Sequence, residues 1–235
     1  MKVFQWIAAV MLSVSLILIM FITSFETAMY ADYDFYRDEY EKYDVLSELN
    51  MEMEDVMHVT KEMMQYLIGR RETLSVIVNI DGQQQDFFNE QDRFHMGEVR
   101  SLFLGGLALR NGGIIVLIIC FLLLIMTKAN IKKILPKAFW IALGGTGVVT
   151  AILAYLFERD FTAAFTVFHQ LFFDNNLWMF DPAEDYMIRM LPEGFFADIA
   201  VRIVTFFLIC ITILLLLSIF ANRFMNKNKG KKQID

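Results

Sequence analysis

Four long apolar runs constrain this chain more than any other feature of its sequence. They lie at residues 3–25, 104–127, 138–157 and 199–221. A helix needs about 20 mostly apolar residues to cross the hydrocarbon core of a bilayer, and each run is close to that length. The chain is 57% hydrophobic, which exceeds the usual share in a water-soluble domain. We therefore predict a mainly α membrane protein with four transmembrane helices.

The first run has a second interpretation, because secretory signal peptides also begin with an apolar stretch. Their apolar core is about 7–15 residues long and ends in small residues at the cleavage point. The run at residues 3–25 is longer, and the Ser-Phe-Glu-Thr sequence at its end does not fit a cleavage site. We expect the run to be retained as the first transmembrane helix, with the signal peptide as the minor alternative.

The segments that connect the apolar runs alternate in charge. Residues 26–100 carry 18 acidic and 7 basic side chains, a formal charge of −11, and residues 158–198 carry 8 acidic side chains and 2 arginines. The short segment 128–137 and the tail 222–235 are instead rich in lysine. Because lysine and arginine collect on the cytoplasmic side of a membrane, we expect both termini to be cytoplasmic. The two acidic segments are then an extracellular cap and a second extracellular loop.

The acidic segment 26–100 shows helical spacing first and strand-like alternation later. Residues 45–67 carry apolar side chains at helical spacing, and this helix should stop near Gly69. Residues 73–80 alternate between apolar and mostly polar side chains, which is typical of a strand. Asp81-Gly82 favours a two-residue turn, after which residues 83–88 can return as a second strand. We predict a small α+β cap made of helices and one short hairpin. Its first helix should carry a tyrosine face that meets the membrane surface or packs against neighbouring helices, formed by Tyr30, Tyr33, Tyr36, Tyr40 and Tyr43.

Several common kinds of site have no counterpart in the sequence. There is no phosphate-loop, dinucleotide or zinc-finger motif, and no basic patch with interleaved aromatic residues to indicate nucleic-acid binding. Cys120 and Cys210 lie inside apolar runs, where we expect them to be chemically inert. The glycines between Gly144 and Gly147 also lie inside an apolar run, so we expect close helix packing there and not phosphate binding.

Two of the three histidines lie in segments with unusual neighbours. His169 falls on the flank of an aromatic stripe that a helix would form from Phe161, Phe165, Phe168 and Phe172, with Trp178 further along the chain. His95 is three residues before Glu98, whose carboxylate would orient the ring or raise its basicity on a helix. Arg100 lies close by, and a surface salt-bridge turn is the alternative for this segment. The third histidine, His58, is expected at the surface.

Both unusual histidines belong to segments expected outside the membrane, near the outer ends of the helices, so the two rings can meet. An imidazole titrates near pH 6.5, which suits general acid–base catalysis. The sequence has no G-x-S-x-G elbow, so an acyl transfer would take its nucleophile from the substrate. A zinc site using His95, Glu98 and His169 is a rival hypothesis, although no HExxH motif is present. Another rival hypothesis is a non-enzymatic accessory protein whose acidic cap binds a partner.

The two histidine segments carry a family resemblance. RFHMGEVRSLF and FTVFHQLFFDNNLWMFDPAEDYMIRMLPEGFF, set among four apolar runs, resemble the lipoprotein intramolecular transacylase family of Gram-positive bacterial membrane proteins. The resemblance extends over nearly the whole chain. It implies a multi-pass protein of the cell membrane with an extracellular cap and an active site on the outer side.

The resemblance also implies a reaction and the residues that carry it. The reaction moves the sn-2 acyl chain of a diacylglyceryl-modified lipoprotein to the α-amine of its N-terminal cysteine, giving the lyso form without metal or cofactor. His95 and His169 would be the catalytic pair. Apart from the resemblance, we expect Glu98 and Arg100 to have supporting roles beside His95. The aromatic walls of the pocket, suited to lipid chains, would be Phe165, Phe168, Phe172 and Trp178.

Overall fold

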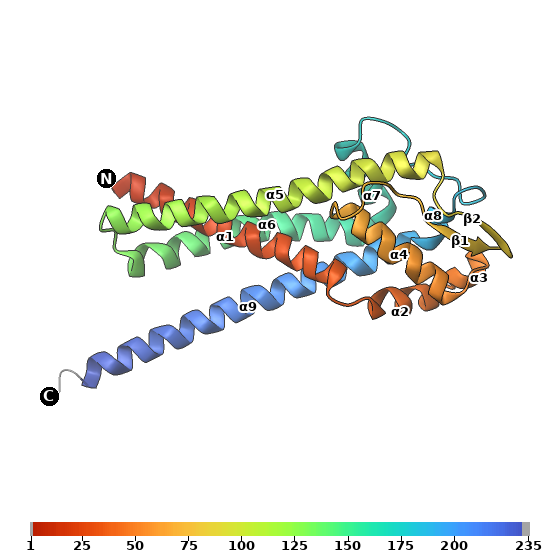
Figure 1. The fold of residues 1–235 in the computed structure, drawn as a ribbon. Helices are drawn as coiled ribbons and strands as arrows, with labels where there is room; N and C mark the ends of the chain where they lie inside the picture. The colour runs from red at the N-terminus through yellow and green to blue at the C-terminus, as the bar shows by residue number, and fades with distance from the viewer. Residues whose placement is uncertain (1, 232–235) are drawn as a thin grey trace.

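The fold is a bundle of long helices that carries a cap at one end (Figure 1). The computed structural model describes residues 2–231. Four of the described helices are long and apolar enough to cross a membrane, which confirms the predicted fold class. They are α1 (Lys2–Tyr30), α5 (Glu90–Met126), α6 (Ile131–Arg159) and α9 (Glu193–Lys231).

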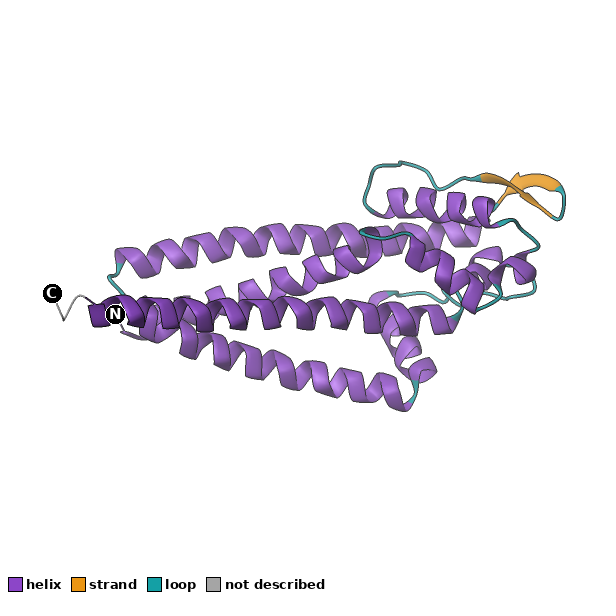
Figure 2. Cartoon of the chain, turned by 90° about the horizontal axis from the view of Figure 1, so that it is seen from below, coloured by secondary structure: helices purple, strands orange, loops and turns teal. Residues whose placement is uncertain are grey.

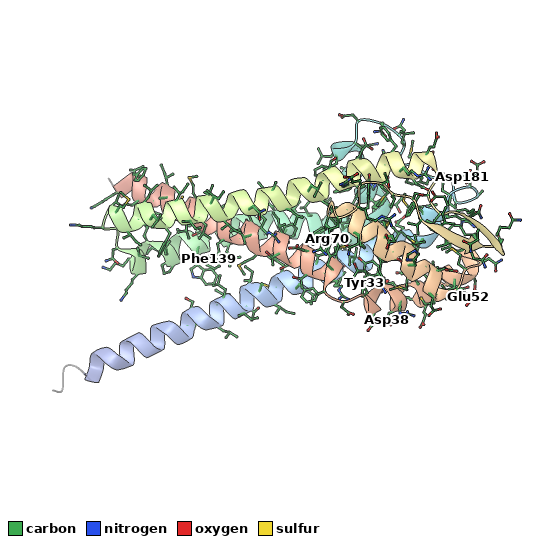
Figure 3. All side chains as sticks on the ribbon, viewed as in Figure 1. Tyr33, Asp38, Glu52, Arg70, Phe139 and Asp181 are labelled. Atoms are coloured by element: carbon green, nitrogen blue, oxygen red, sulfur yellow. The ribbon has the colours of Figure 1, made fainter. Side chains whose placement is uncertain are left out.

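The cap gathers short elements from two separate parts of the chain. Figure 2 shows it at the end of the bundle opposite to the one where the described chain begins and ends. In Figure 3 the labelled Asp38, Glu52 and Asp181 lie at the cap end, whereas Phe139 lies along the bundle. The cap elements are α2 (Asp34–Lys42), α3 (Val45–Leu49), α4 (Met53–Leu67), β1 (Ile77–Ile80), β2 (Gln83–Asp86), α7 (Phe161–Phe172) and α8 (Tyr186–Met190).

Helix α1 is the centre of the bundle, since it packs against α5, α6 and α9. Small residues on α1, including Ala8, Ala9 and Ser13, are buried in these contacts. On α5, a Cβ added to Gly113 would lie 3.4 Å from Ile19 Cγ1, so the glycine allows α1 and α5 to approach closely. Small residues are the usual means by which helices associate in a membrane, where the lipid tails are as apolar as the side chains.

The cap has an apolar core of its own, and two of the tyrosines lie inside it. Tyr36 and Tyr40 are fully buried. The Tyr40 hydroxyl is 2.6 Å from the Thr60 hydroxyl, and the Tyr36 hydroxyl donates to the Met29 carbonyl over 3.0 Å. Buried hydroxyls need such partners, because an unpaired polar group inside a core is destabilising. Packing against neighbouring helices therefore accounts for the middle of the tyrosine pattern.

The hairpin forms at the expected turn. Strands β1 and β2 pair antiparallel, with Ile80 opposite Gln83. Asp81 and Gly82 have φ of 53° and 78°, so both central residues are left-handed, as in the type I′ turn that suits a tight hairpin. The strands are shorter than the alternating pattern predicts. Val78 and Ile80 on β1 point into the cap core.

The structure departs from the sequence-based expectations at several places. Asn50 adopts φ of 49° and divides the helix expected over residues 45–67 into α3 and α4. The expectation of close packing at Gly144–Gly147 is wrong, because a Cβ built on any of those glycines meets no described atom of another helix within 4 Å. Helix α6 begins at Ile131, inside the expected loop 128–137. The end of the basic tail, residues 232–235, lies outside the described residues.

Gly194 joins the cap to the first turn of α9. The ring of Tyr43 lies against it so closely that an added Cβ would overlap the ring atoms. In this position the Tyr43 hydroxyl donates to the Asp198 carboxylate over 2.6 Å, and Lys42 pairs with the same carboxylate.

Replacing Gly194 with alanine should therefore displace Tyr43 and weaken its hydrogen bond. Such bonds to charged groups contribute about 1.5–3 kcal/mol, and alanine returns about 1 kcal/mol in helix propensity. We expect a net loss of roughly 0.5–2 kcal/mol in the free energy of unfolding of the purified protein in detergent. Gly145→Ala, which meets no neighbour, is the matched control and should cause no loss. Equal unfolding midpoints for the two variants would contradict this packing.

Candidate active site

The two histidines singled out in the sequence come together in the structure. Their ring centroids are 5.9 Å apart and the ring planes differ by 27°, so the rings are stacked. His95 lies in the second turn of α5 and is 5% exposed, while His169 lies on α7 and is 7% exposed. Figure 1 shows α7 beside the cap end of α5. The third histidine, His58, is exposed on α4 and lies apart from this pair.

Aromatic side chains enclose the histidine pair. Around His169, the ring of Phe165 has its centroid at 4.2 Å, that of Trp178 at 4.7 Å and that of Phe168 at 5.4 Å. The predicted wall residue Phe172 packs against Phe168 with ring centroids 4.8 Å apart and lies one step further from the histidines. These rings exclude water from the imidazoles.

Two further aromatic residues that the sequence did not single out complete the enclosure. Phe173 lies 4.9 Å from the His95 ring and 5.4 Å from the His169 ring, and Phe180 lies 5.5 Å from the His95 ring. Phe173 follows α7 in extended backbone and therefore does not share the helical stripe. The helical stripe was the only pattern in this segment that predicted wall residues, and Phe173 does not lie on it.

The His169 ring is held in one tautomer. Its Nδ1 is 2.8 Å from the carbonyl oxygen of Phe165, one helical turn earlier. A carbonyl oxygen only accepts hydrogen bonds, so Nδ1 carries the proton of the neutral ring. The lone pair is therefore on Nε2, and His169 presents a proton acceptor whose orientation is fixed by the backbone.

Glu98 lies beside His95 as the helical spacing predicted. Its Oε2 is 3.9 Å from His95 Nδ1, and its Oε1 accepts a 2.8 Å hydrogen bond from Asn175 Nδ2. Neither Oε2 of Glu98 nor Nδ1 of His95 has a hydrogen-bond partner within residues 2–231. Asn175 belongs to the loop after α7, so its contact with α5 could not be predicted from residue spacing.

Arg100 lies on another face of α5. Its guanidinium is over the Tyr66 ring, 4.7 Å from the centroid, and it donates to the Glu72 carbonyl over 3.4 Å. These contacts connect α5 to α4 and to the segment before the hairpin. The structure thus brings Glu98 to the histidines but directs Arg100 into the cap.

Hydrogen bonds at the start of α5 hold the two halves of the site together. Asn89 caps the helix and forms a reciprocal capping box with Asp92. The Asn89 side chain also donates to Asp185, and Gln91 Nε2 donates to the Leu177 carbonyl over 3.0 Å. The loop between α7 and α8 is therefore fixed to α5, which sets the position of its tryptophan and asparagine over the histidines.

A cavity of about 700 Å³ extends from the histidines between the helices of the bundle. Side chains from α1, α5, α7 and α9 line it, among them Phe25, Leu102, Phe165 and Ile203. Nearly all of these side chains are apolar. The cavity is therefore suited to hydrocarbon, and the two histidines are among its few polar lining residues.

The enclosure changes the protonation of both rings. Both lie outside the long apolar runs, because His95 precedes Leu102, where the apolar part of α5 begins, and His169 lies on the short helix α7. Burial, together with the charge of the neighbouring His169, lowers the pKa of His95 to about 4. Burial also lowers the pKa of His169, although the hydrogen bond to Phe165 opposes this. Both rings are thus neutral at pH 7. The expectation that Glu98 raises the basicity of His95 is wrong, because burial dominates.

The rival zinc hypothesis required three ligands in one place. Within the described part of the chain, no group of three or more histidine, cysteine, aspartate or glutamate side chains is arranged to hold a metal ion. His95, Glu98 and His169 do not form such a cluster.

The fold and the site define an integral membrane protein in which a capped helical bundle holds two buried histidines at the head of an apolar cavity. The family model of the lipoprotein intramolecular transacylase Lit matches residues 10–196. The chain belongs to this family, and it is therefore an enzyme of the transacylase class.

Solved structures share the fold. An in meso structure of the membrane-integral lipoprotein intramolecular transacylase Lit from Bacillus cereus superposes with a TM-score of 0.75 at 19% identity, over 95% of this chain and 100% of that chain. Two variants of that protein, with a histidine changed to arginine or to alanine, give a TM-score of 0.69 at 19% identity. They cover 93% of this chain and 94% and 96% of their own. No curated protein matches the chain.

The lowered pKa of His95 predicts how stability depends on pH. The unfolded chain protonates His95 below about pH 6.5, whereas the folded protein resists protonation until about pH 4. Stability should therefore be lost as the pH falls through this window. The free energy of unfolding of wild type minus that of His95→Asn should decrease from pH 6.5 towards pH 4.

The difference between wild type and His95→Asn cancels the contribution of Asp92, which would otherwise oppose the effect of His95. Burial raises the pKa of Asp92 to about 6, which favours the folded state as the pH falls, but Asp92 is present in both proteins. Unfolding curves in detergent across the window provide the measurement. Parallel pH dependences for wild type and His95→Asn would show that His95 is not buried as a neutral ring.

Proposed function

We propose that this enzyme moves the sn-2 acyl chain of a diacylglyceryl-modified lipoprotein to the α-amine of its N-terminal cysteine, at the outer face of the cell membrane. The observation that carries the proposal is the stacked pair of neutral imidazoles at the head of an apolar cavity. Membership of the transacylase family supports the reaction type. The acidic charge of the cap segments, set against the basic short loop, supports the outer location.

The substrate provides both reacting groups. Counting the amine nitrogen, Cα, Cβ, sulfur, two glycerol carbons, the ester oxygen and the acyl carbon, the attack closes an eight-membered ring. Such a ring is entropically unfavourable in free solution. A confining site that holds the amine against the carbonyl removes much of this barrier. The enzyme therefore needs proton acceptors and a shaped pocket but no nucleophile of its own.

The proton balance of the reaction requires two transfers. An N–C bond forms to the acyl carbon and the C–O bond to glycerol breaks. The α-ammonium starts with three protons and the amide product keeps one. One proton ends on the glycerol oxygen and the other is released to solvent. Two acceptors beside the reacting nitrogen match this count.

The environments of the two rings suggest how the transfers are divided. His169 presents Nε2, and its Nδ1–H bond to the Phe165 carbonyl stabilises the imidazolium form. It takes the proton from the attacking nitrogen and returns it to the glycerol oxygen. His95, whose pKa is about 4, accepts the proton that converts ammonium to amine and passes it on without retaining it.

The aromatic walls and the cavity hold the lipid part of the substrate. Phe165, Phe168 and Trp178 exclude water from the reacting atoms, which prevents hydrolysis from competing with transfer. Phe172 extends the same wall, and the acyl chains occupy the apolar cavity below. Besides the lipoprotein substrate, the phospholipid bilayer is the other partner of the enzyme.

Substitution of either histidine tests the proposal. His95→Ala and His169→Ala should each reduce formation of the lyso lipoprotein by about 100-fold or more, the range of general acid–base catalysis. His58→Ala is the matched control, because this exposed histidine on α4 lies away from the cavity, and it should retain activity. The measurement is mass spectrometry of a lipoprotein N-terminus from cells that express each variant at equal membrane levels. Unreduced lyso product from both cavity variants would exclude the two-histidine mechanism.

A further inference from the structure

Two shielded polar atoms beside the histidine pair lack hydrogen-bond partners within the described chain. Oε2 of Glu98 and Nδ1 of His95 are 3.9 Å apart, and no hydrogen-bond partner for either is present in the described chain. The side chain of His95 is 7% exposed, and that of Glu98 is 27% exposed with Oε2 itself shielded. A shielded carboxylate oxygen without a donor is unfavourable. Oε2 of Glu98 therefore requires a hydrogen-bond donor from outside the described chain, and Nδ1 of His95 can accept from the same donor when the ring carries its proton on Nε2.

The chemistry of the two atoms defines that donor. A carboxylate oxygen only accepts hydrogen bonds, and a neutral imidazole nitrogen accepts when its lone pair faces the partner. A group with several N–H donors and a positive charge satisfies both at once. An ammonium fits this description, since it carries three donors and no acceptor. Of the two α5 arginines close to these residues in sequence, Arg93 pairs with Asp86 and Arg100 is directed to Tyr66 and Glu72, so neither fills this position.

We propose that Glu98 binds the α-ammonium of the substrate's N-terminal cysteine, and that Asn175 fixes the carboxylate for this purpose. The inference rests on the proposed acyl transfer, because it assigns the place of the attacking nitrogen. Asn175 Nδ2 holds Oε1 of Glu98 over 2.8 Å, which leaves Oε2 directed at the unpaired nitrogen of His95. The ammonium is then received next to the ring that accepts its proton.

Asn175 connects this recognition group to the second histidine. The Asn175 carbonyl accepts a 3.0 Å hydrogen bond from Trp178 Nε1, and its side-chain oxygen accepts from Leu177 N over 2.9 Å. Trp178 in turn packs on the His169 ring at 4.7 Å. One tight turn therefore positions both the ammonium-binding carboxylate and the aromatic wall of His169.

The arrangement also accounts for product release. Acyl transfer converts the charged ammonium into a neutral amide, which has one N–H in place of three. The product can no longer satisfy Glu98 and His95 together. Glu98 thus selects lipoproteins with a free N-terminus and loses affinity for them once they are acylated.

A pair of non-reactive analogues tests the inference. Each is a diacylglyceryl-cysteine peptide with an ether in place of the sn-2 ester; one has a free α-ammonium and the other is N-acetylated. The full-length wild-type protein in lipid nanodiscs should bind the ammonium form about 10-fold to 100-fold more tightly, as expected for charge-assisted hydrogen bonds. Glu98→Gln should abolish most of this preference. Glu90→Gln, at an exposed position on the first turn of α5, should keep it.

Three outcomes would overturn the inference. The first is that wild type binds both analogues with equal affinity. The second is that Glu98→Gln keeps the preference for the ammonium form, and the third is that Glu98→Gln lowers the affinity for both analogues by the same factor. The last result would show that Glu98 only positions His95, or that a water molecule occupies the site. The ether analogues do not react, so this preference is measured independently of catalysis. Failure of wild type to form lyso product from the ester substrate would instead overturn the proposed function.

Discussion

The removal of two imidazole rings from water is the constraint on which the rest of this structure depends. Two stacked basic rings inside an aromatic enclosure cannot both carry charge without a large loss of solvation. They are therefore neutral at pH 7, and each has a lone pair available. An enzyme that borrows its nucleophile from the substrate needs acceptors of this kind.

Such a pair can exist only if two elements distant in the sequence are held rigidly together. His95 belongs to a helix that continues from the cap into the bundle, and His169 belongs to a short helix that follows α6. The side chains of Asn89 and Gln91 attach the loop after α7 to the start of α5. On the other side, Asp86 accepts hydrogen bonds from Ser75, Val76 and Arg93, which attach the hairpin to the same turn. The cap is thus the scaffold of the site.

The sequence predicted the features that depend on local pattern. Apolar length identified the four long helices, and Asp81-Gly82 identified the turn, because both residues tolerate positive φ. The helical spacing placed Glu98 next to His95. The break at Asn50 was missed, because apolar spacing continues across it and only the backbone conformation reveals it.

Features that depend on contacts between distant segments could not be predicted. Asn175 reaches Glu98 across 77 positions of sequence, and Phe173 joins the enclosure from extended backbone after its helix has ended. Gly144–Gly147 has the composition of a packing motif, yet α6 presents it to open space. Arg100 was expected to support the site, but its side chain lies over Tyr66 on α4.

The most direct test of the central claim is a structure of the full-length protein with a bound diacylglyceryl-cysteine peptide whose sn-2 ester is replaced by an ether. The account predicts that the sn-2 linkage lies between the His95 and His169 rings and that the lipid chains occupy the cavity lined by α1, α5, α7 and α9. A linkage bound away from either ring, or lipid chains lying outside that cavity, would contradict it.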